Sequence, residues 1–205
     1  MARILILNGS PRAPKSNSKQ YAEIFIKKCP AETKYLNITK TNHSEICDSI
    51  EHISDLIFVF PLYADSLPVT LLEFLKYLEK HPPQNKPTVS VLVNCGFIEP
   101  EQNDIAVKMI RLFCSKNGYP FGSVLKIGSG EAILSTPFRI LVRSKIKKLV
   151  SSVIKKSHLT LSVTMPISKN MFIRASTVYW ENYGKKNGIT KEQMETMKIE
   201  DFSGN

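Results

Sequence analysis

The sequence lacks long apolar runs. Its most continuous ones, residues 56–60 and 89–93, have the length of a strand, whereas a membrane-spanning helix needs about 20 residues. Near the N-terminus, residues 4–7 are apolar, but Asn8 and Gly9 end this run before it reaches the length of a signal-peptide core. We therefore expect a protein without a membrane span, located in the cytoplasm.

Closely spaced metal ligands are also missing. The four cysteines (Cys29, Cys47, Cys95 and Cys114) form no CxxC pair, and the four histidines have no metal-ligand spacing. This pattern argues against a zinc site or an iron-sulfur cluster, and we expect no metal. Isolated free cysteines usually behave as small apolar side chains and are buried, which is what we expect here.

Several nucleotide and hydrolase motifs are absent as well. The sequence contains neither GxxxxGK[ST], which argues against a P-loop triphosphatase, nor GxGxxG, which argues against the usual dinucleotide-binding fold. Ser129 lies between two glycines but not in the GxSxG frame of a hydrolase nucleophile. We therefore expect no hydrolase nucleophile at Ser129.

Negative charge is scarce toward the C-terminus. The net charge is +10, and residues 139–205 carry 13 Lys or Arg against 5 Asp or Glu. Such an excess attracts phosphate-bearing ligands, nucleic acid or anionic membranes. The cations form no arginine-rich block and have no interleaved aromatic residues, so we expect no nucleic-acid partner; a solvated basic face is the simpler interpretation.

What is present is an alternation of short apolar strands and amphipathic helices. Strand patterns occur at residues 3–8, 33–38, 56–60, 88–93 and 121–127. Helical spacing follows from Asn17, around 44–53, from Pro68, from Pro100 and over 140–157, where Ile146, Leu149, Val150, Val153 and Ile154 are expected to face inward. Strands that alternate with helices predict an α/β fold with a five-stranded, doubly wound parallel sheet and helices on both faces.

At 205 residues the chain fits one domain with an extension better than two domains. We expect a single domain over 1–205, with a core at 1–157 and a C-terminal extension at 158–205. The extension contains a predicted helix at 176–186 and a short one from Thr190. We expect it to cover the active edge of the sheet or a partner subunit.

The loops that follow the strands are the candidate functional segments, because ligands of open α/β sheets bind beyond the carboxyl ends of the strands. The first loop, Asn8 to Ser18, is rich in hydroxyl and amide groups and leads into a helix N-terminus, where a phosphate is stabilised. An ordinary polar connection has the same composition. The loops at 61–68 and 94–97 add Tyr63, Phe97 and amide groups to the same edge. A flat heteroaromatic ligand could stack on such aromatic side chains and form hydrogen bonds with the amide groups.

Three of these segments resemble the flavodoxin-like NAD(P)H-dependent FMN reductases and quinone reductases: ILILNGSPR with SNS, PLYADSLP, and VNCGF. The resemblance covers about residues 3–130 and implies the sheet order 2-1-3-4-5. It implies that the FMN phosphate is held by Ser10, Arg12, Ser16, Asn17 and Ser18. It further implies that the isoalloxazine ring is held by Pro61, Leu62, Tyr63, Ala64, Asn94, Cys95, Gly96 and Phe97. The loop from Gly128 to Glu131 is expected to complete the rim.

The expected function is then an FMN oxidoreductase that passes hydride from NAD(P)H to a quinone, a flavin or another small acceptor. The family resemblance also suggests a homodimer. Two alternatives remain: a flavodoxin-type electron carrier, which is typically acidic where this chain is basic, and a flavodoxin-fold interaction module without cofactor that binds an anionic surface through residues 145–156. The sequence does not distinguish NADH from NADPH.

Overall fold

The computed structural model describes residues 3–13 and 15–196. The described residues fall into two compact units, which are divided between Met165 and Pro166. In the first unit the strands are β1 (Arg3–Asn8), β2 (Glu32–Asn37), β3 (Asp55–Pro61), β4 (Thr88–Asn94), β5 (Phe121–Ile127) and β6 (Thr160–Val163). All neighbouring strands are parallel, in the order β2-β1-β3-β4-β5-β6. The predicted order of five strands is confirmed within a sheet of six.

The number five was therefore wrong. The sixth strand, β6, pairs with β5 from Val124–Thr160 to Ile127–Val163 and lies in the segment that the sequence pattern assigned to the extension. It has four residues, and only Val163 among them is buried. An edge strand that is short and exposed has no continuous apolar run, which is the pattern by which the other strands were found.

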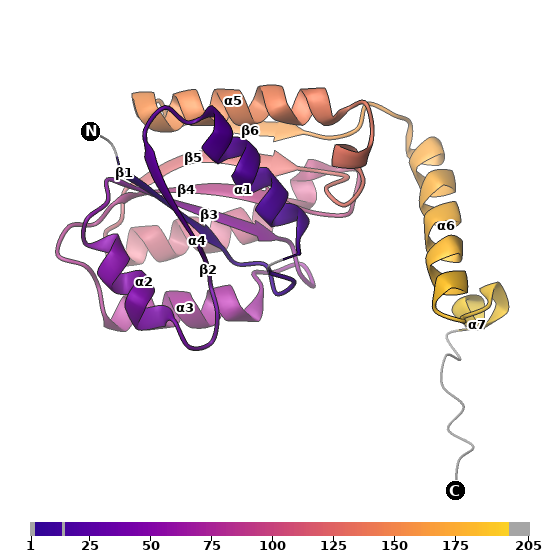
Figure 1. The fold of residues 1–205 in the computed structure, drawn as a ribbon, viewed down its shortest axis with the longest axis horizontal. Helices are drawn as coiled ribbons and strands as arrows, with labels where there is room; N and C mark the ends of the chain where they lie inside the picture. Colours follow the sequence, from indigo (N-terminus) through magenta and orange to yellow (C-terminus); the bar gives the residue numbers. More distant parts are fainter. Residues whose placement is uncertain (1–2, 14, 197–205) are drawn as a thin grey trace, which may run out of the picture. The chain divides into compact units, whose positions relative to one another are not determined.

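Helices cover both faces of the sheet (Figure 1). They are α1 (Asn17–Lys28), α2 (His43–Ile50), α3 (Val69–Lys80), α4 (Asp104–Asn117) and α5 (Arg139–Lys155), with short 3-10 helices at Pro100–Asn103 and Ile133–Ser135. One face carries α1 and α5, and the other carries α2, α3 and α4 (Figure 1). This is the doubly wound α/β arrangement that the alternation of strands and helices predicts.

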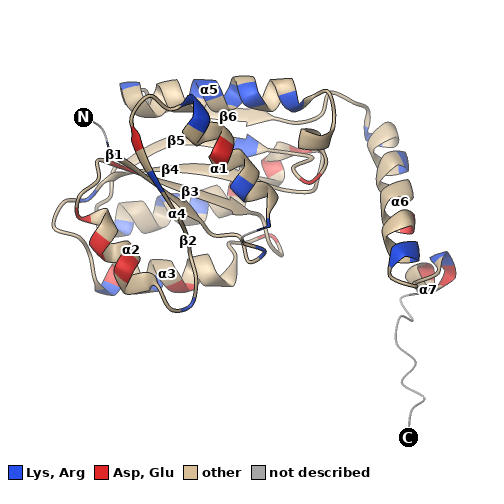
Figure 2. Cartoon of the chain, in the orientation of Figure 1, with Lys and Arg blue, Asp and Glu red and all other residues tan. Residues whose placement is uncertain are grey.

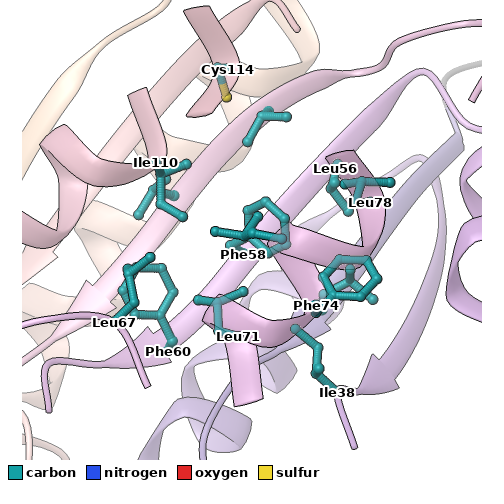
Figure 3. Close-up of a cluster of buried hydrophobic side chains, with 14 of the residues drawn as sticks. Ile38, Leu56, Phe58, Phe60, Leu67, Leu71, Phe74, Leu78, Ile110 and Cys114 are labelled. Atoms are coloured by element: carbon teal, nitrogen blue, oxygen red, sulfur yellow. The ribbon is translucent and has the colours of Figure 1, made fainter. Parts of the chain in front are cut away.

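The core has one apolar layer on each face. Along the central strands, alternate residues such as Phe58 and Phe60 pack with Leu71 and Phe74 of α3 and Ile110 of α4 (Figure 3). The intervening residues face α1 and α5, because successive side chains of a strand point to opposite faces. Strands β1, β3 and β4 are thus buried on both sides, which explains their nearly unbroken apolar sequences.

Helix α5 follows its predicted amphipathic pattern with one exception. Ile146, Leu149, Val150 and Val153 are buried, as predicted, but Ile154 is 37% exposed. Ile154 directly follows the buried Val153, and one residue further along a helix the side chain is rotated by about 100°. Ile154 therefore lies at the border of the buried face.

The second unit contains α6 (Lys169–Lys186) and α7 (Lys191–Thr196). Helix α6 begins at Lys169, seven residues before the predicted position. Ser168 is its N-cap, and its side chain accepts a hydrogen bond from the N–H of Met171. Gly184 is buried against Met194 of α7; a side chain at this position would lie 2.6 Å from the Met194 sulfur. That the unit covers the core or a partner subunit stays a prediction.

Candidate functional site

A buried amide organises the loop that leaves β1. Asn8 is fully buried, and its Nδ2 donates to Tyr35 Oη at 2.9 Å and to Asn37 Oδ1 at 3.1 Å, both on β2. Its Oδ1 accepts the N–H of Ser10 at 3.0 Å. Because buried polar groups are paired, Asn8 fixes where the chain leaves the sheet and turns toward α1.

The loop ends at the N-terminus of α1. Ser16 has extended backbone and caps the helix: its Oγ accepts the N–H of Lys19 at 3.2 Å. The first N–H groups of a helix have no acceptor within the helix, and in the described part of the chain nothing accepts those of Asn17 and Ser18. These groups, at the positive end of the helix dipole, form an anion-binding element.

A tight turn follows β3. Tyr63 and Ser66 exchange two backbone hydrogen bonds, at 3.1 and 3.0 Å. The two residues between them, Ala64 and Asp65, have positive φ angles of 46° and 55°, as a type I′ turn requires. The turn leaves the Tyr63 side chain 55% exposed at the carboxyl edge of the sheet.

The loops after β4 and β5 are bonded to each other. The N–H of Cys95 donates to the carbonyl of Ile127 at 2.9 Å, and the N–H of Gly130 donates to the carbonyl of Cys95 at 2.7 Å. The contact is close enough to exclude a side chain at Gly128, where a Cβ would lie 2.6 Å from the carbonyl oxygen of Ile98. The two loops therefore form one rigid wall.

Helix α1 is attached to this wall by two buried hydrogen bonds. Tyr21 Oη donates to the carbonyl of Gly130 at 2.6 Å, and Asn94 Nδ2 donates to Ser18 Oγ at 3.0 Å. Burial raises the pKa of Tyr21 well above its usual range, so its hydroxyl stays protonated and keeps donating. The segments after β1, β4 and β5 thus meet at one edge of the sheet.

A cavity of about 580 Å³ lies between these loops, within the usual size range of small-molecule sites. Its lining combines hydroxyl and amide groups with three cations (Arg12, Lys15 and Lys19) and two carboxylates (Glu23 and Glu131). Arg12 Nη1 lies 3.7 Å from Glu131 Oε1 in an exposed ion pair that joins the first and last loops. The balance of charge favours an anionic ligand.

Nine of the thirteen residues that the resemblance implied line this cavity: Ser10, Arg12, Ser16, Asn17, Ser18, Pro61, Leu62, Tyr63 and Asn94. The other four (Ala64, Cys95, Gly96 and Phe97) are not among its lining residues. Ala64 lies at the tip of the turn described above. The structure thus brings the phosphate-binding candidates together completely and the ring-binding candidates in part; binding itself stays a prediction.

Cys95 is directed into the protein. Its sulfur accepts a hydrogen bond from Asn103 Nδ2 at 3.3 Å and lies 3.8 Å from the carbonyl oxygen of Phe97. Burial raises the pKa of the thiol to about 11, so it is neutral at physiological pH. Cys95 therefore contributes its backbone to the site, whereas its thiol pairs inside the wall.

Sequence reasoning did not select several lining residues: Pro11, Lys15, Lys19, Gln20 and Glu23. Three of them follow Ser16 and Asn17 on the first two turns of α1, where a ligand at the helix N-terminus would meet them. Their place on the first two turns of a helix that follows a phosphate-binding loop could have identified them from the sequence. Glu131, the remaining one, is the last residue of the loop that was expected to complete the rim.

Over residues 3–13 and 15–196, no cluster of His, Cys, Asp and Glu could hold a metal ion. The four cysteines are free, with Cys95 and Cys114 buried and the other two half-buried. The cavity therefore offers hydrogen-bond donors and cations instead of metal ligands.

Neither a protein-family model nor a curated protein matches the sequence. Solved structures do match its fold. They include a flavodoxin of Streptococcus pneumoniae TIGR4 (17% identity, TM-score 0.56, 76% of this chain and 99% of the other) and the NAD(P)H:quinone oxidoreductase of Methanothermobacter marburgensis (15%, 0.57, 73% and 95%). A third is an FMN-dependent NADH-azoreductase of Bacillus anthracis in complex with FMN (15%, 0.54, 74% and 98%).

One match is a longer protein: this chain spans 35% of the rubredoxin oxygen:oxidoreductase of Desulfovibrio gigas. At 13–17% identity these similarities show the fold, which is flavodoxin-like. The matches to the FMN-dependent azoreductase, the quinone oxidoreductase and the flavodoxin each cover 73–76% of this chain.

Proposed function

We propose that this chain is an FMN-binding oxidoreductase that passes hydride from NAD(P)H to a small acceptor such as a quinone or a flavin. One observation carries the proposal. At the carboxyl edge of a flavodoxin-like sheet, the cavity joins a helix N-terminus rich in anion-binding groups to a rim formed by Pro61, Leu62 and Tyr63. Ligands of open α/β sheets bind at this edge.

The identities of the structural neighbours support the same function. They include quinone reductases, azoreductases and a flavodoxin, and one azoreductase was solved with FMN bound. Since fold alone does not determine function, the argument depends on the cavity.

The donors at one end of the cavity fit a phosphate monoester. The N–H groups of Asn17 and Ser18, the hydroxyl of Ser10 and the cations Arg12 and Lys15 all belong to the same loop and helix start. A phosphate dianion accepts several hydrogen bonds at once, and a helix N-terminus with flanking hydroxyl groups supplies them. These residues would hold the phosphate of FMN.

The rim fits a planar ring. Leu62 and Tyr63 line the cavity, and the exposed tyrosine ring offers a flat surface for stacking. When bound, FMN supplies the hydride chemistry, so this chain needs no side chain as nucleophile. Leu62 and Tyr63 would then position the ring, and the hydrogen-bonded loops after β4 and β5 would keep this end of the cavity in shape.

The positive charge of the chain favours a reductase over an electron carrier. NAD(P)H carries several phosphates, and a protein of net charge +10 attracts such substrates from solution. A flavodoxin-type carrier remains the second candidate because one structural neighbour is a flavodoxin. We further propose that the protein acts in the cytoplasm, as a homodimer.

The first test is a titration of the purified protein with FMN, followed by visible absorbance and flavin fluorescence. We expect saturable binding, which Lys15→Gln and Tyr63→Ser each weaken roughly tenfold through loss of a charge or a stacking surface. Lys28→Gln, at the far end of α1, is the control for a change of one charge. NADH and NADPH oxidation with a quinone or free flavin is then measured on the flavin-loaded protein.

Three results distinguish the candidates. Flavin binding with NAD(P)H oxidation supports the reductase. Flavin binding without NAD(P)H oxidation supports the carrier. A colourless protein that takes up no FMN rules out both and leaves the interaction module without cofactor.

A further inference from the structure

The outer face of α5 is purely basic. Its exposed side chains include Arg139, Arg143, Lys147, Lys148 and Lys155, and the helix contains no Asp or Glu. In Figure 2 this helix is marked by blue segments alone. The opposite side of the helix, with Ile146 and Leu149, is buried against the sheet, so the cations share the side that faces solvent.

This distribution of charge is specific to one part of the chain. Each of the other four α-helices described in the first unit carries acidic residues: Glu23 on α1, Glu45 on α2, Glu73 on α3 and Asp104 on α4. By contrast, residues 132–180 contain nine Lys or Arg and no Asp or Glu. An ordinary solvated face carries both signs, which lowers repulsion between like charges.

Apolar side chains lie among the cations of α5. Ile140 is 68% exposed, Leu141 is 40% exposed and Ile154 is 37% exposed. On a helix these residues occupy the same outward arc as Arg143, Lys147 and Lys148. The face therefore combines positive charge with apolar groups that water solvates poorly.

Helix α6 repeats the combination. Its apolar stripe is Met171, Val178, Tyr179 and Tyr183, spaced as residues of one helix face, and each of these side chains is more than half exposed. Neighbouring Trp180 contacts both tyrosine rings edge-on, at centroid distances of 5.2 and 5.9 Å. Arg174, three residues after Met171 and four before Val178, borders this stripe, and so does Lys185, seven residues after Val178. On another side of the helix, Ile173, Thr177 and Trp180 line a groove together with Met194 and Glu195 of α7.

We propose that the outer face of α5 and the apolar stripe of α6 bind the surface of a bilayer that contains anionic phospholipids. Lys and Arg attract the lipid phosphates and carboxylates, while Trp and Tyr are the side chains that partition into the membrane interface. Each helix carries cations and exposed apolar side chains by itself, aliphatic on α5 and partly aromatic on α6, so either one can contact the bilayer. The activity proposed above is not needed for this binding.

Other occupants fit less well. Nucleic acid would pair with the cations and could stack on the aromatic rings, but it offers no partner for exposed aliphatic side chains such as Ile140, Met171 and Val178. A second copy of the chain would bring two basic α5 faces together, and like charges repel. An anionic bilayer satisfies the charged and the apolar groups at once.

The geometry predicts binding on the membrane surface, not across the membrane. None of the helices described between residues 3 and 196 has both the length and the apolar character to span a bilayer. Helix α6 would lie in the interface plane with its exposed apolar stripe toward the acyl chains. Helix α5, whose main apolar side is buried against the sheet, would contact the lipid headgroups through its outer face.

The tryptophan content makes the test direct, because Trp180 is the only Trp in the chain and reports on α6 alone. The full-length protein is mixed with vesicles of phosphatidylcholine alone and with vesicles in which about a third of the lipid is phosphatidylserine. We expect flotation with the anionic vesicles only, a blue shift of the Trp180 emission, and release at high salt.

Two variants separate the charged and apolar contributions. The triple change Arg143→Gln, Lys147→Gln and Lys148→Gln lowers the partition coefficient of the protein onto anionic vesicles roughly 100-fold. This corresponds to about fivefold for each cation removed. The double change Val178→Ser and Tyr179→Ser abolishes the blue shift. The matched control, Lys76→Gln with Lys80→Gln and Lys108→Gln on α3 and α4, alters the charge equally on the other face of the sheet and leaves binding unchanged. Circular dichroism verifies that each variant is folded.

Several outcomes would overturn the proposal. Equal binding to neutral vesicles removes the role of the cations, and equal loss of binding in the matched control removes the role of the α5 face. Flotation without any change in Trp180 emission removes the role of α6. If duplex DNA at a similar concentration releases the protein from the vesicles, the basic face of α5 is assigned to nucleic acid. If the protein sediments as a dimer and does not bind vesicles, the apolar stripe of α6 is assigned to contact with a second copy.

Discussion

Asn94, at the end of β4, donates its side-chain amide to Ser18 Oγ in the first turn of α1, at 3.0 Å and across 76 positions of the sequence. The same Nδ2 donates to the carbonyl of Phe60 on β3 at 3.1 Å. One buried amide thus connects the helix that would receive a phosphate to the two strands whose loops form the rest of the cavity. The site is held in shape by the interior of the sheet edge.

Replacing Asn94 should therefore affect both stability and ligand binding. Asn94→Ala leaves Ser18 Oγ and the Phe60 carbonyl without this donor, at a cost of about 2–3 kcal/mol in the free energy of unfolding, measured by urea denaturation. The affinity for FMN falls in parallel because Ser18 loses its position. Asn117→Ala, which removes one half-buried bond to the Phe113 carbonyl, is the control and costs about 1 kcal/mol or less. Equal effects of the two changes would contradict the role of Asn94.

Glu131 opposes an anionic ligand. Its carboxylate pairs with Arg12 on the rim of the cavity, so a bound phosphate competes with it for the guanidinium. Glu131→Gln should tighten FMN binding roughly threefold to tenfold at low salt, with a smaller gain at high salt because exposed charges are screened. Glu45→Gln, on the exposed side of α2, should leave the affinity unchanged. A weaker affinity in Glu131→Gln would show instead that the ion pair holds the loops in a binding-competent position.

A second ion pair lies at the opposite edge of the sheet. Asp55, which is buried at the start of β3, binds Lys156, the left-handed residue that ends α5 at φ 53°. Lys156→Met should lower the free energy of unfolding by about 2 kcal/mol, below the value for a fully buried pair because the lysine is half exposed. Lys156→Gly loses the same pair but relieves the left-handed backbone, and should recover about 1 kcal/mol of that loss. Methionine and glycine variants of equal stability would show that the backbone is not strained.

The buried thiols predict a loss of stability at alkaline pH. Burial raises the pKa of Cys114 from 9.0 to about 12 and those of Cys47 and Cys95 to about 11. Since these pKa values are raised by folding, the stabilisation is complete below about pH 9, where the thiols of the unfolded chain are still protonated, and is lost as the pH rises toward 11–12. Urea midpoints should therefore fall steadily above about pH 9.

Cys114→Ala tests this directly. Near pH 8 the variant should be less stable by about 1–2 kcal/mol because of the cavity it leaves in the core. Its further loss of stability above pH 9 should be shallower than that of the wild type, by up to about 1.4 kcal/mol per pH unit. Parallel curves for the two proteins would contradict the contribution of this thiol. Native Cys95 and Cys114 should also react slowly with a thiol reagent at neutral pH.

Most of the fold could be predicted because it depends on local patterns. Apolar runs such as residues 56–60 and 88–93 are long enough to require burial on both faces, which only an inner strand of a covered parallel sheet provides. The strand β6 was missed since its pairing with β5 is an edge contact that leaves Thr160 and Ser162 exposed. No local signal distinguishes such a strand from a polar loop.

The candidate site was predictable for a similar reason and to a similar extent. Parallel strands bring their carboxyl ends to one edge, so the loops after β1, β3 and β4 had to be neighbours. The direction of each side chain was not predictable. Cys95 turns inward because Asn103, eight residues later, donates to its sulfur, and Ala64 occupies the tip of a turn closed by Tyr63 and Ser66.

The sequence by itself determined the five longer strands, the helices of the first unit, the positive charge of residues 139–205 and the loops in which a ligand would bind. These follow from periodicity and composition over a few residues. Only the tertiary structure decided that Asn94 meets Ser18 and that Glu131 meets Arg12. Such contacts join positions far apart in the chain, and no local pattern specifies them.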